Sequence, residues 1–171
     1  MKLFIFFAVC IATVLADPEW ILIPEGEVAL VKDSWNRVKN NEVDILYFIF
    51  KAYPDIQSQF AAFAGKDLDT LKDTGKFAIH AGRIVNFFSQ YVELLGGAQT
   101  QPAIKTVLNE LGATHKSRGI SKAQFNEFQL GLFAYLKENV SWGDNVEKAW
   151  NDVFSKAYYV IFSNLDGVAV V

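Results

Sequence analysis

Apolar residues recur at spacings of three and four along most of this chain, a period that favours helices. In residues 26–39 the pattern consists of Val28, Val31, Trp35 and Val38. Residues 43–53 are rich in large apolar side chains and stop before Pro54, and a longer helix is expected over about 70–93. No alternation of apolar and polar residues indicates a strand. The sequence therefore predicts an all-α fold, and its mix of long helices and short linkers argues against a plain four-helix bundle.

Helix-start and helix-stop signals divide the second half of the chain. Gly96 and Gly97 are expected to end the long helix, and Pro102 fits the first position of a helix that reaches His115.

Two pairs of residues are typical of the capping box that opens a helix. Ser121 is followed after three residues by Gln124, and Asp144 is followed in the same way by Glu147. They predict the starts of the last two helices. The tail at 166–171, DGVAVV, is expected to fray.

The first sixteen residues, MKLFIFFAVCIATVLA, are typical of a secretory signal peptide. One positive charge, Lys2, precedes an apolar run, and Ala16 is a small residue suited to cleavage. The run is shorter than the roughly 20 apolar residues that span a bilayer, so no membrane anchor is expected. Residues 1–16 are therefore predicted to be removed, which leaves 17–171 as a single domain.

The composition excludes several classes of protein. Apolar residues make up 51% of the chain and charged residues 20%, which is typical of a globular rather than a disordered protein. Loss of Lys2 would take the net charge from −3 to −4, and no Lys/Arg cluster is present, so we expect no nucleic-acid partner. The only cysteine, Cys10, lies in the predicted signal peptide. No disulfide can then hold the secreted domain.

The chain has two histidines, and each lies on the apolar stripe of its own helix. Phe77 precedes His80 by three residues and Ile84 follows it by four, while His115 continues a stripe that includes Leu108. A buried imidazole needs a hydrogen-bond partner or a metal. One interpretation is two unrelated core histidines, each bonded to a backbone carbonyl. The other is a single ligand shared between the two helices.

A bare metal ion does not suit this pattern. Zinc usually takes four ligands, or three and a water, and neither stripe offers a cysteine, a third histidine or a carboxylate. Two imidazoles in an aromatic pocket suit a metal that brings its own equatorial ligands, and haem is such a group. A large, flat apolar group would also account for an aromatic share of 15% in a domain without disulfides. Taken alone, the spacing suggests haem without establishing it.

Three stretches of the chain resemble the globin family. DILYFIFKAYPDIQSQFAAFAGKDL matches the globin pattern in which a helix ends at a proline and a phenylalanine follows six residues later, here Pro54 and Phe60. HAGRIVNFF and HKSRGI resemble the segments that carry the distal and proximal histidines. The similarity covers nearly all of 17–171 and is greatest to the secreted haemoglobins of chironomid midge larvae. It implies a globin fold, with helices packed around a haem pocket.

The resemblance implies a role for each candidate residue. His115 would be the proximal ligand of the haem iron, with its other ring nitrogen donating to the Leu111 carbonyl, helped by Thr114. His80 would be the distal histidine that stabilises a bound ligand, and Phe60 would pack flat on the haem, expected to be haem b. Arg83 and Arg118 would meet the haem propionates. The other cofactor-binding residues would be Phe63, Leu46, Ile84, Leu111 and Ile120.

The function that this resemblance implies is that of a secreted, extracellular haemoglobin. It would bind dioxygen reversibly, and also carbon monoxide, for oxygen transport or storage, as a monomer or homo-oligomer. It is not expected to be an enzyme. The alternative is a globin with peroxidase or nitric oxide dioxygenase activity, although the sequence shows no flavin or nicotinamide domain. A haem-free carrier similar to insect odorant-binding proteins is disfavoured, because those proteins rely on cysteine pairs.

Two further features concern the surface. The stretch GGAQTQ makes the connection between the two histidines longer than in these globins, and a surface insertion of this size costs little. Asn139-Val140-Ser141 is a sequon for N-linked glycosylation, a kind of site that often stays unused.

Overall fold

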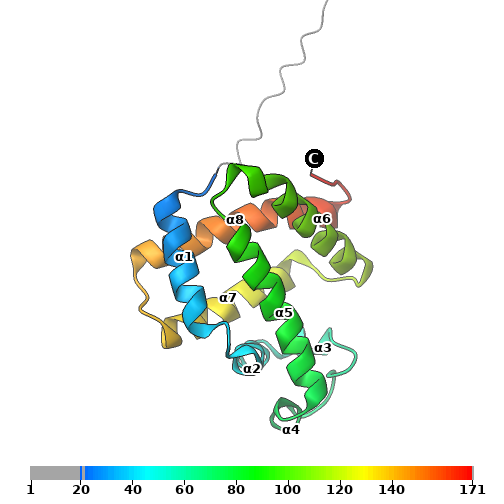
Figure 1. Cartoon of the computed structure of the whole chain (residues 1–171). Helices are drawn as coiled ribbons and strands as arrows, with labels where there is room; N and C mark the ends of the chain where they lie inside the picture. The colour runs from blue at the N-terminus through cyan, green and yellow to red at the C-terminus, as the bar shows by residue number, and fades with distance from the viewer. Residues whose placement is uncertain (1–19, 21, 171) are drawn as a thin grey trace, which may run out of the picture.

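The computed structural model describes residue 20 and residues 22–170, which form eight α-helices, one 3-10 helix and no strand (Figure 1). The all-α prediction is confirmed. The predicted signal peptide, 1–16, lies outside the described residues. The elements are α1 (Glu25–Val38), α2 (Glu42–Ala52), α3 (Pro54–Ser58), α4 (Leu68–Lys72), α5 (Gly75–Leu94), η1 (Ala98–Thr100), α6 (Gln101–Ser117), α7 (Lys122–Asn139) and α8 (Asp144–Asp166).

Side-chain caps decide where α5 and α7 begin. The predicted capping box of α7 is present: the Ser121 hydroxyl accepts the Gln124 backbone N–H, and the Gln124 side chain accepts the Ser121 N–H at 2.9 Å. The predicted start of α5 near residue 70 is wrong. Asp67 caps the short α4, and Thr74 then caps α5 by accepting the Phe77 N–H. The periodic apolar residues predict one helix here, but the caps at Asp67 and Thr74 divide the segment into α4 and α5.

The predicted capping box of the last helix is also wrong. α8 begins at Asp144 itself, and Gly143 at the N-cap makes no side-chain hydrogen bond. Glu147 accepts the indole N–H of Trp142 at 2.9 Å and pairs with Lys137 of α7 at 3.2 Å. The Glu147 carboxylate, which the predicted capping box required, is therefore bound to Trp142 and Lys137 instead.

The predicted fraying of the C-terminal tail is wrong for its described residues. Gly167 ends α8 in the left-handed region, at a φ of 100°. Beyond it, the Val170 N–H donates to Asn109 Oδ1 at 3.0 Å, and the Val170 carbonyl accepts from Asn109 Nδ2 at 2.7 Å. The Asn109 side chain of α6 thus holds a segment 61 residues further along the chain. A sequence pattern over a few neighbouring residues cannot predict such a long-range contact.

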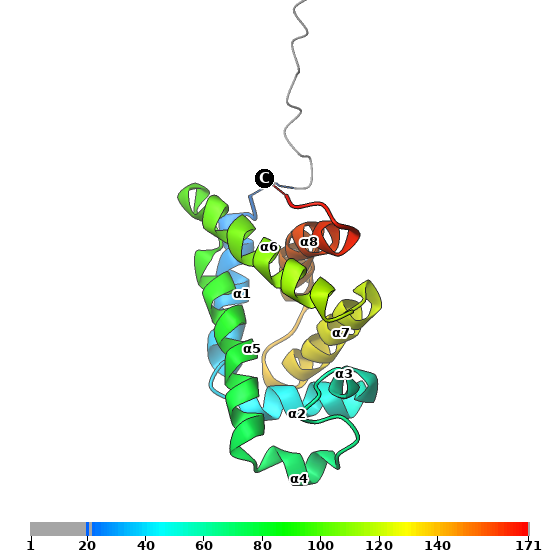
Figure 2. The same cartoon turned by 90° about the vertical axis from the view of Figure 1, so that its right-hand side faces the viewer.

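The helices cross one another instead of running as a parallel bundle (Figures 1 and 2). α6 packs on α8, α1 packs on both α8 and α5, and α2 packs on α5 and α7. The linker between the two histidine helices turns at Gly96, with a φ of 92°, and continues into η1, which leads directly into α6. Within the described part of the chain, no helix combines the length and hydropathy needed to span a membrane.

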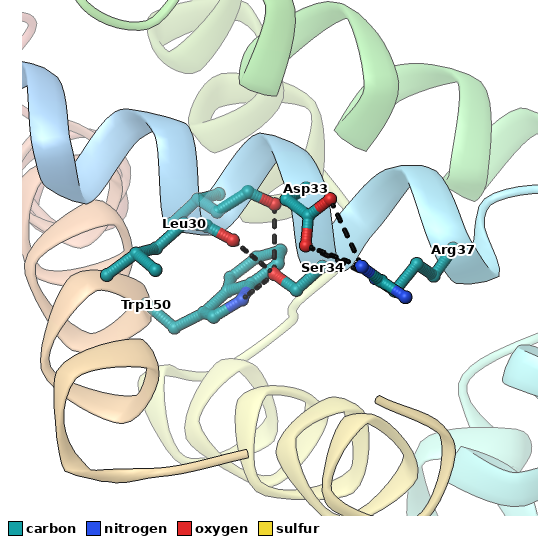
Figure 3. A network of polar contacts seen from close by, with 6 residues as sticks. Leu30, Asp33, Ser34, Arg37 and Trp150 are labelled. Carbon is teal, nitrogen blue, oxygen red and sulfur yellow. Dashed lines mark hydrogen bonds and ion pairs between the residues drawn. The ribbon is translucent and has the colours of Figure 1, made fainter. Parts of the chain in front are cut away.

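A buried hydrogen bond fixes the crossing of α1 and α8 (Figure 3). The indole N–H of Trp150 donates to Ser34 Oγ at 2.9 Å, and the Ser34 hydroxyl donates to the Leu30 carbonyl at 2.8 Å. The side chains of Trp150 and Ser34 are buried, whereas the Asp33–Arg37 ion pair on the same helix is exposed. The hydrogen bond between Trp150 and Ser34 therefore satisfies the indole N–H of a large core residue without admitting water.

α6 approaches α8 so closely at Gly112 that a side chain has no room. A Cβ atom at this position would lie 2.7 Å from Asn164 Cβ and 3.0 Å from the Ile161 carbonyl oxygen. Gly112 lies one turn before His115, so this contact sets the position of the helix segment that carries the histidine.

We expect Gly112→Ala to destabilise the protein by about 1–3 kcal/mol, because the added methyl group must push α6 away from the α8 backbone. Chemical denaturation measures the effect. Gly26→Ala is the matched control: nothing lies within 4 Å of a Cβ there, so this change should be neutral or mildly stabilising. Equal losses in both variants would show that the close approach does not limit the α6–α8 contact.

Candidate functional site

A cavity of about 380 Å³ lies between α3, α5, α6, α7 and α8. Its volume falls within the range of about 300–1,000 Å³ that is usual for ligand and cofactor sites. Figure 2 shows how α3, α5, α6 and α7 are arranged, four of the helices that lie around this cavity. The polar residues of the wall are Gln59, His80, Arg83, His115, Arg118 and Gln124. The apolar and aromatic residues are Ile56, Phe60, Ile84, Phe87, Phe88, Tyr91, Leu108, Leu111, Ile120, Phe125, Phe128, Phe154, Ala157, Tyr158 and Ile161.

His115 is held by the backbone of its own helix. Its Nδ1 atom lies 2.8 Å from the Leu111 carbonyl oxygen, which also accepts the Thr114 hydroxyl at 2.9 Å. A carbonyl oxygen only accepts, so Nδ1 must carry the proton in this contact. The predicted hydrogen bond is therefore confirmed. It leaves the Nε2 atom of the neutral ring with a free lone pair.

The surroundings of His115 favour this neutral form. Burial lowers the pKa of the ring below its usual value; the hydrogen bond to Leu111 opposes that shift, and the charge of Arg118 adds to it. Phe125 of α7 packs against the imidazole, with 5.2 Å between ring centroids. The ring is thus oriented and unprotonated at neutral pH, as a metal-binding imidazole must be.

His80 reaches the same cavity from α5. Its ring meets Phe60 and Phe63 edge to face, with centroids 4.7 Å and 5.6 Å apart. Burial lowers the pKa of His80, and the charges of Arg83 and Arg118 lower it further. The imidazole is therefore neutral at pH 7 and can donate one N–H to a ligand in the cavity.

The structure brings most of the predicted site residues together. Besides the two histidines, the predicted residues in the cavity wall are Phe60, Arg83, Ile84, Leu111, Arg118 and Ile120. Arg83 and Arg118 are exposed to solvent, so their charged ends lie at the edge of the cavity and not within it.

Two predicted residues, Leu46 and Phe63, are not part of the cavity wall. Leu46 is 1% exposed in the core. Phe63 is 2% exposed and packs between Phe50 and Phe77 while its ring supports His80. Phe60, which lines the cavity, packs against Phe63 with ring centroids 6.1 Å apart, so Phe63 lies behind the wall.

The prediction missed the wall formed by α7 and α8. Phe125 and Phe128 come from α7, and Phe154, Tyr158 and Ile161 come from α8. Their spacings of three and four mark an apolar face in the sequence. The period does not say whether such a face meets the core or a cavity, so this signal identified buried residues without identifying lining residues.

The donor groups of this site fit haem better than a bare metal ion. Among the described residues, no group of three His, Cys, Asp or Glu side chains is placed to hold a metal. The site offers one imidazole with its lone pair free, a second neutral imidazole and a largely aromatic wall. Arg83 and Arg118 at the edge of the cavity can pair with the carboxylates of an otherwise apolar group.

Comparisons with known proteins point to one family. Residues 43–161 match the family model described as Globin. The chain is 50% identical over 162 residues to Globin CTT-Z of Chironomus thummi piger, covering 95% of this chain and 97% of that protein. It is 49% identical over 162 residues to Globin CTT-II beta of Chironomus thummi thummi, covering 95% and 99%.

Solved structures give the same result. A hemoglobin component, TA-VII, from Tokunagayusurika akamusi superposes with a TM-score of 0.84 at 45% identity, covering 87% of this chain and all of that chain. The globin of Drosophila melanogaster superposes with a TM-score of 0.75 over 86% of this chain. At 24% identity, the second comparison supports the fold alone.

One carboxyl pair lies beside the cavity, between α3 and α7. Asp55 precedes the lining residue Ile56, and Glu127 precedes the lining residue Phe128. The hydrogen bond shared with Asp55, followed by burial, raises the pKa of Glu127. Two carboxyl groups can share a hydrogen bond only while one of them holds a proton. Glu127 Oε2 is buried without a hydrogen-bond partner among the described residues.

We expect this pair to weaken the fold as the pH rises. A carboxyl group whose pKa is raised by folding stabilises the native state fully below its unfolded pKa, and this contribution is lost as the pH rises through the folded pKa. Asp55→Asn replaces the shared proton with a permanent amide donor, so it should melt higher than the wild type at neutral pH, with the difference shrinking toward pH 4. Melting curves over this range test it, with Asp73→Asn as the control at an exposed position. A melting-temperature difference that does not change with pH would contradict the shared proton.

Proposed function

Because the chain belongs to the globin family, we propose that it binds haem b in this cavity and thereby binds dioxygen reversibly, for transport or storage. The observation that carries the proposal is the imidazole of His115, whose Nδ1–H is committed to the Leu111 carbonyl. This contact leaves Nε2 free to bind iron from the wall of an apolar cavity.

His115 would hold the haem iron, and the aromatic wall would enclose the ring. Phe60 and Ile84 would contact it on the side of His80, with Phe63 supporting His80 from behind. Arg83 and Arg118 would pair with the propionates at the cavity edge. Covalent attachment of haem through thioethers needs cysteines, and the only one in the sequence is Cys10, which supports non-covalent haem b.

Haem, when bound, supplies a ferrous iron that coordinates dioxygen reversibly and shifts negative charge onto it. The role of the protein is then to hold a hydrogen-bond donor close to the bound ligand in a pocket that excludes water. The neutral His80 can donate its N–H to a polarised ligand, and the rings of Phe60 and Phe63 restrict its motion. The largely apolar wall keeps water away from the iron, which slows its oxidation.

We further propose that the protein acts outside the cell. The first sixteen residues have the pattern of a signal peptide, and its removal would leave a chain without cysteine. The names of the relatives describe globins and a hemoglobin, which supports a carrier over an enzyme. Rates of peroxide turnover and of nitric oxide oxidation would separate the carrier from the enzymatic alternative, since a carrier should turn over neither efficiently.

We expect His115→Gly to lose stable haem attachment, because no other side chain on that helix face can replace the imidazole. Free imidazole should partly restore the ligated absorption spectrum. Ala113→Gly is the matched control, since it places glycine at an exposed position of the same helix and should retain haem. A His115→Gly protein with an unchanged ferrous spectrum in the absence of imidazole would refute the assignment.

We expect His80→Leu to speed dioxygen release by roughly ten- to a hundredfold. The basis is that a hydrogen bond to a charged partner contributes about 1.5–3 kcal/mol. Carbon monoxide gains less charge on binding, so its release should change far less. Stopped-flow measurement of both dissociation rates tests this, with His80→Gln as the control that keeps an N–H donor. Unchanged dioxygen release in His80→Leu would leave the histidine as a core residue without a role in ligand binding.

A further inference from the structure

The sequence contains one site for N-linked glycosylation, and the structure places it on the surface. Asn139-Val140-Ser141 is the only Asn-X-Ser/Thr stretch among the 171 residues, and its middle residue is not proline. Asn139 is the last residue of α7, and both Asn139 and Ser141 are exposed. The backbone at Val140 is extended, with φ −134° and ψ 164°, so the chain leaves the helix at this point.

The folded surroundings can accommodate a sugar on this side chain. Asn139 Nδ2 donates one hydrogen bond, to the Tyr135 carbonyl at 2.8 Å. An amide nitrogen carries two hydrogens, so one of them can be replaced by a glycosidic bond while the other keeps the hydrogen bond to Tyr135. Glycans are added to the unfolded chain, so folding only requires that the modified residue end at the surface, as Asn139 does.

The position also keeps a glycan away from the ligand cavity. The α7 residues in the cavity wall are Gln124, Phe125 and Phe128, in the first half of the helix. Asn139 lies eleven residues beyond Phe128, which is about 16 Å along a helix axis. A sugar at the far end of α7 would therefore leave ligand entry unaffected.

We propose that Asn139 carries an N-linked glycan in the secreted protein, an inference that rests on the secretion proposed above. The donor is a lipid-linked oligosaccharide pyrophosphate. The bond from Asn139 Nδ2 to the first sugar carbon forms, and the bond from that carbon to the pyrophosphate oxygen breaks. The lipid pyrophosphate leaves with the electron pair, and the amide proton is lost to a base of the transferase.

The test expresses the full-length chain in insect cells and treats protein from both medium and cells with peptide N-glycosidase F. We expect a decrease in apparent mass on treatment, with conversion of Asn139 to aspartate seen by mass spectrometry. Asn139→Gln and Ser141→Ala should migrate like the treated wild type. Ser141→Thr should keep the glycan. Dioxygen release should be the same in Asn139→Gln as in the wild type.

A second arm separates this inference from the proposed secretion. Residues 17–171 are placed behind the signal peptide of an established secreted protein, which delivers the sequon to the transferase independently of residues 1–16. Modified protein in this arm, with no secreted protein in the first arm, would refute the native signal peptide and support Asn139 as an acceptor. An unmodified Asn139 in secreted protein of either arm would overturn the glycan.

Discussion

The hydrogen bond between His115 Nδ1 and the Leu111 carbonyl is the interaction on which the site depends. It exists only because both residues belong to one helix, where the carbonyl of residue i−4 lies beside the side chain of residue i. Burial then makes it hard to break, since an imidazole N–H without a partner is costly in an apolar cavity. Helix geometry and burial together select one tautomer and so decide which nitrogen can bind a metal.

Contacts between α6 and α8 hold that helix in place. Gly112 lets α6 approach the α8 backbone, and Asn164 Nδ2 donates to Asn109 Oδ1 at 2.6 Å from the other side of the interface. Asn109 in turn holds the tail at Val170. Asn109, Gly112 and Asn164 are not among the residues that line the cavity, yet their contacts set the position of His115 relative to α5. A change at the α6–α8 interface is thus expected to reach the site through helix position.

The two histidines differ in chemistry although both are neutral. His115 is oriented by a backbone acceptor and presents a lone pair, whereas His80 packs edge to face with Phe60 and Phe63 and retains an N–H to donate. The positive charges of Arg83 and Arg118 help keep His80 unprotonated. One cavity thus combines a metal-binding nitrogen with a separate hydrogen-bond donor.

The sequence by itself determined the helical class, the capping box at Ser121, the apolar stripes and the place of both histidines on them. Each of these follows from contacts within about four residues, which the spacing of residue types records. Tertiary structure alone decided that α7 and α8 line the cavity, that Leu46 and Phe63 are buried without lining it, and that Val170 is bound to Asn109. Tertiary structure also decided that Glu147 binds Trp142 and Lys137 and does not form a capping box. Hydrophobic burial has no direction, so a sequence shows which face of a helix is buried but not against which partner.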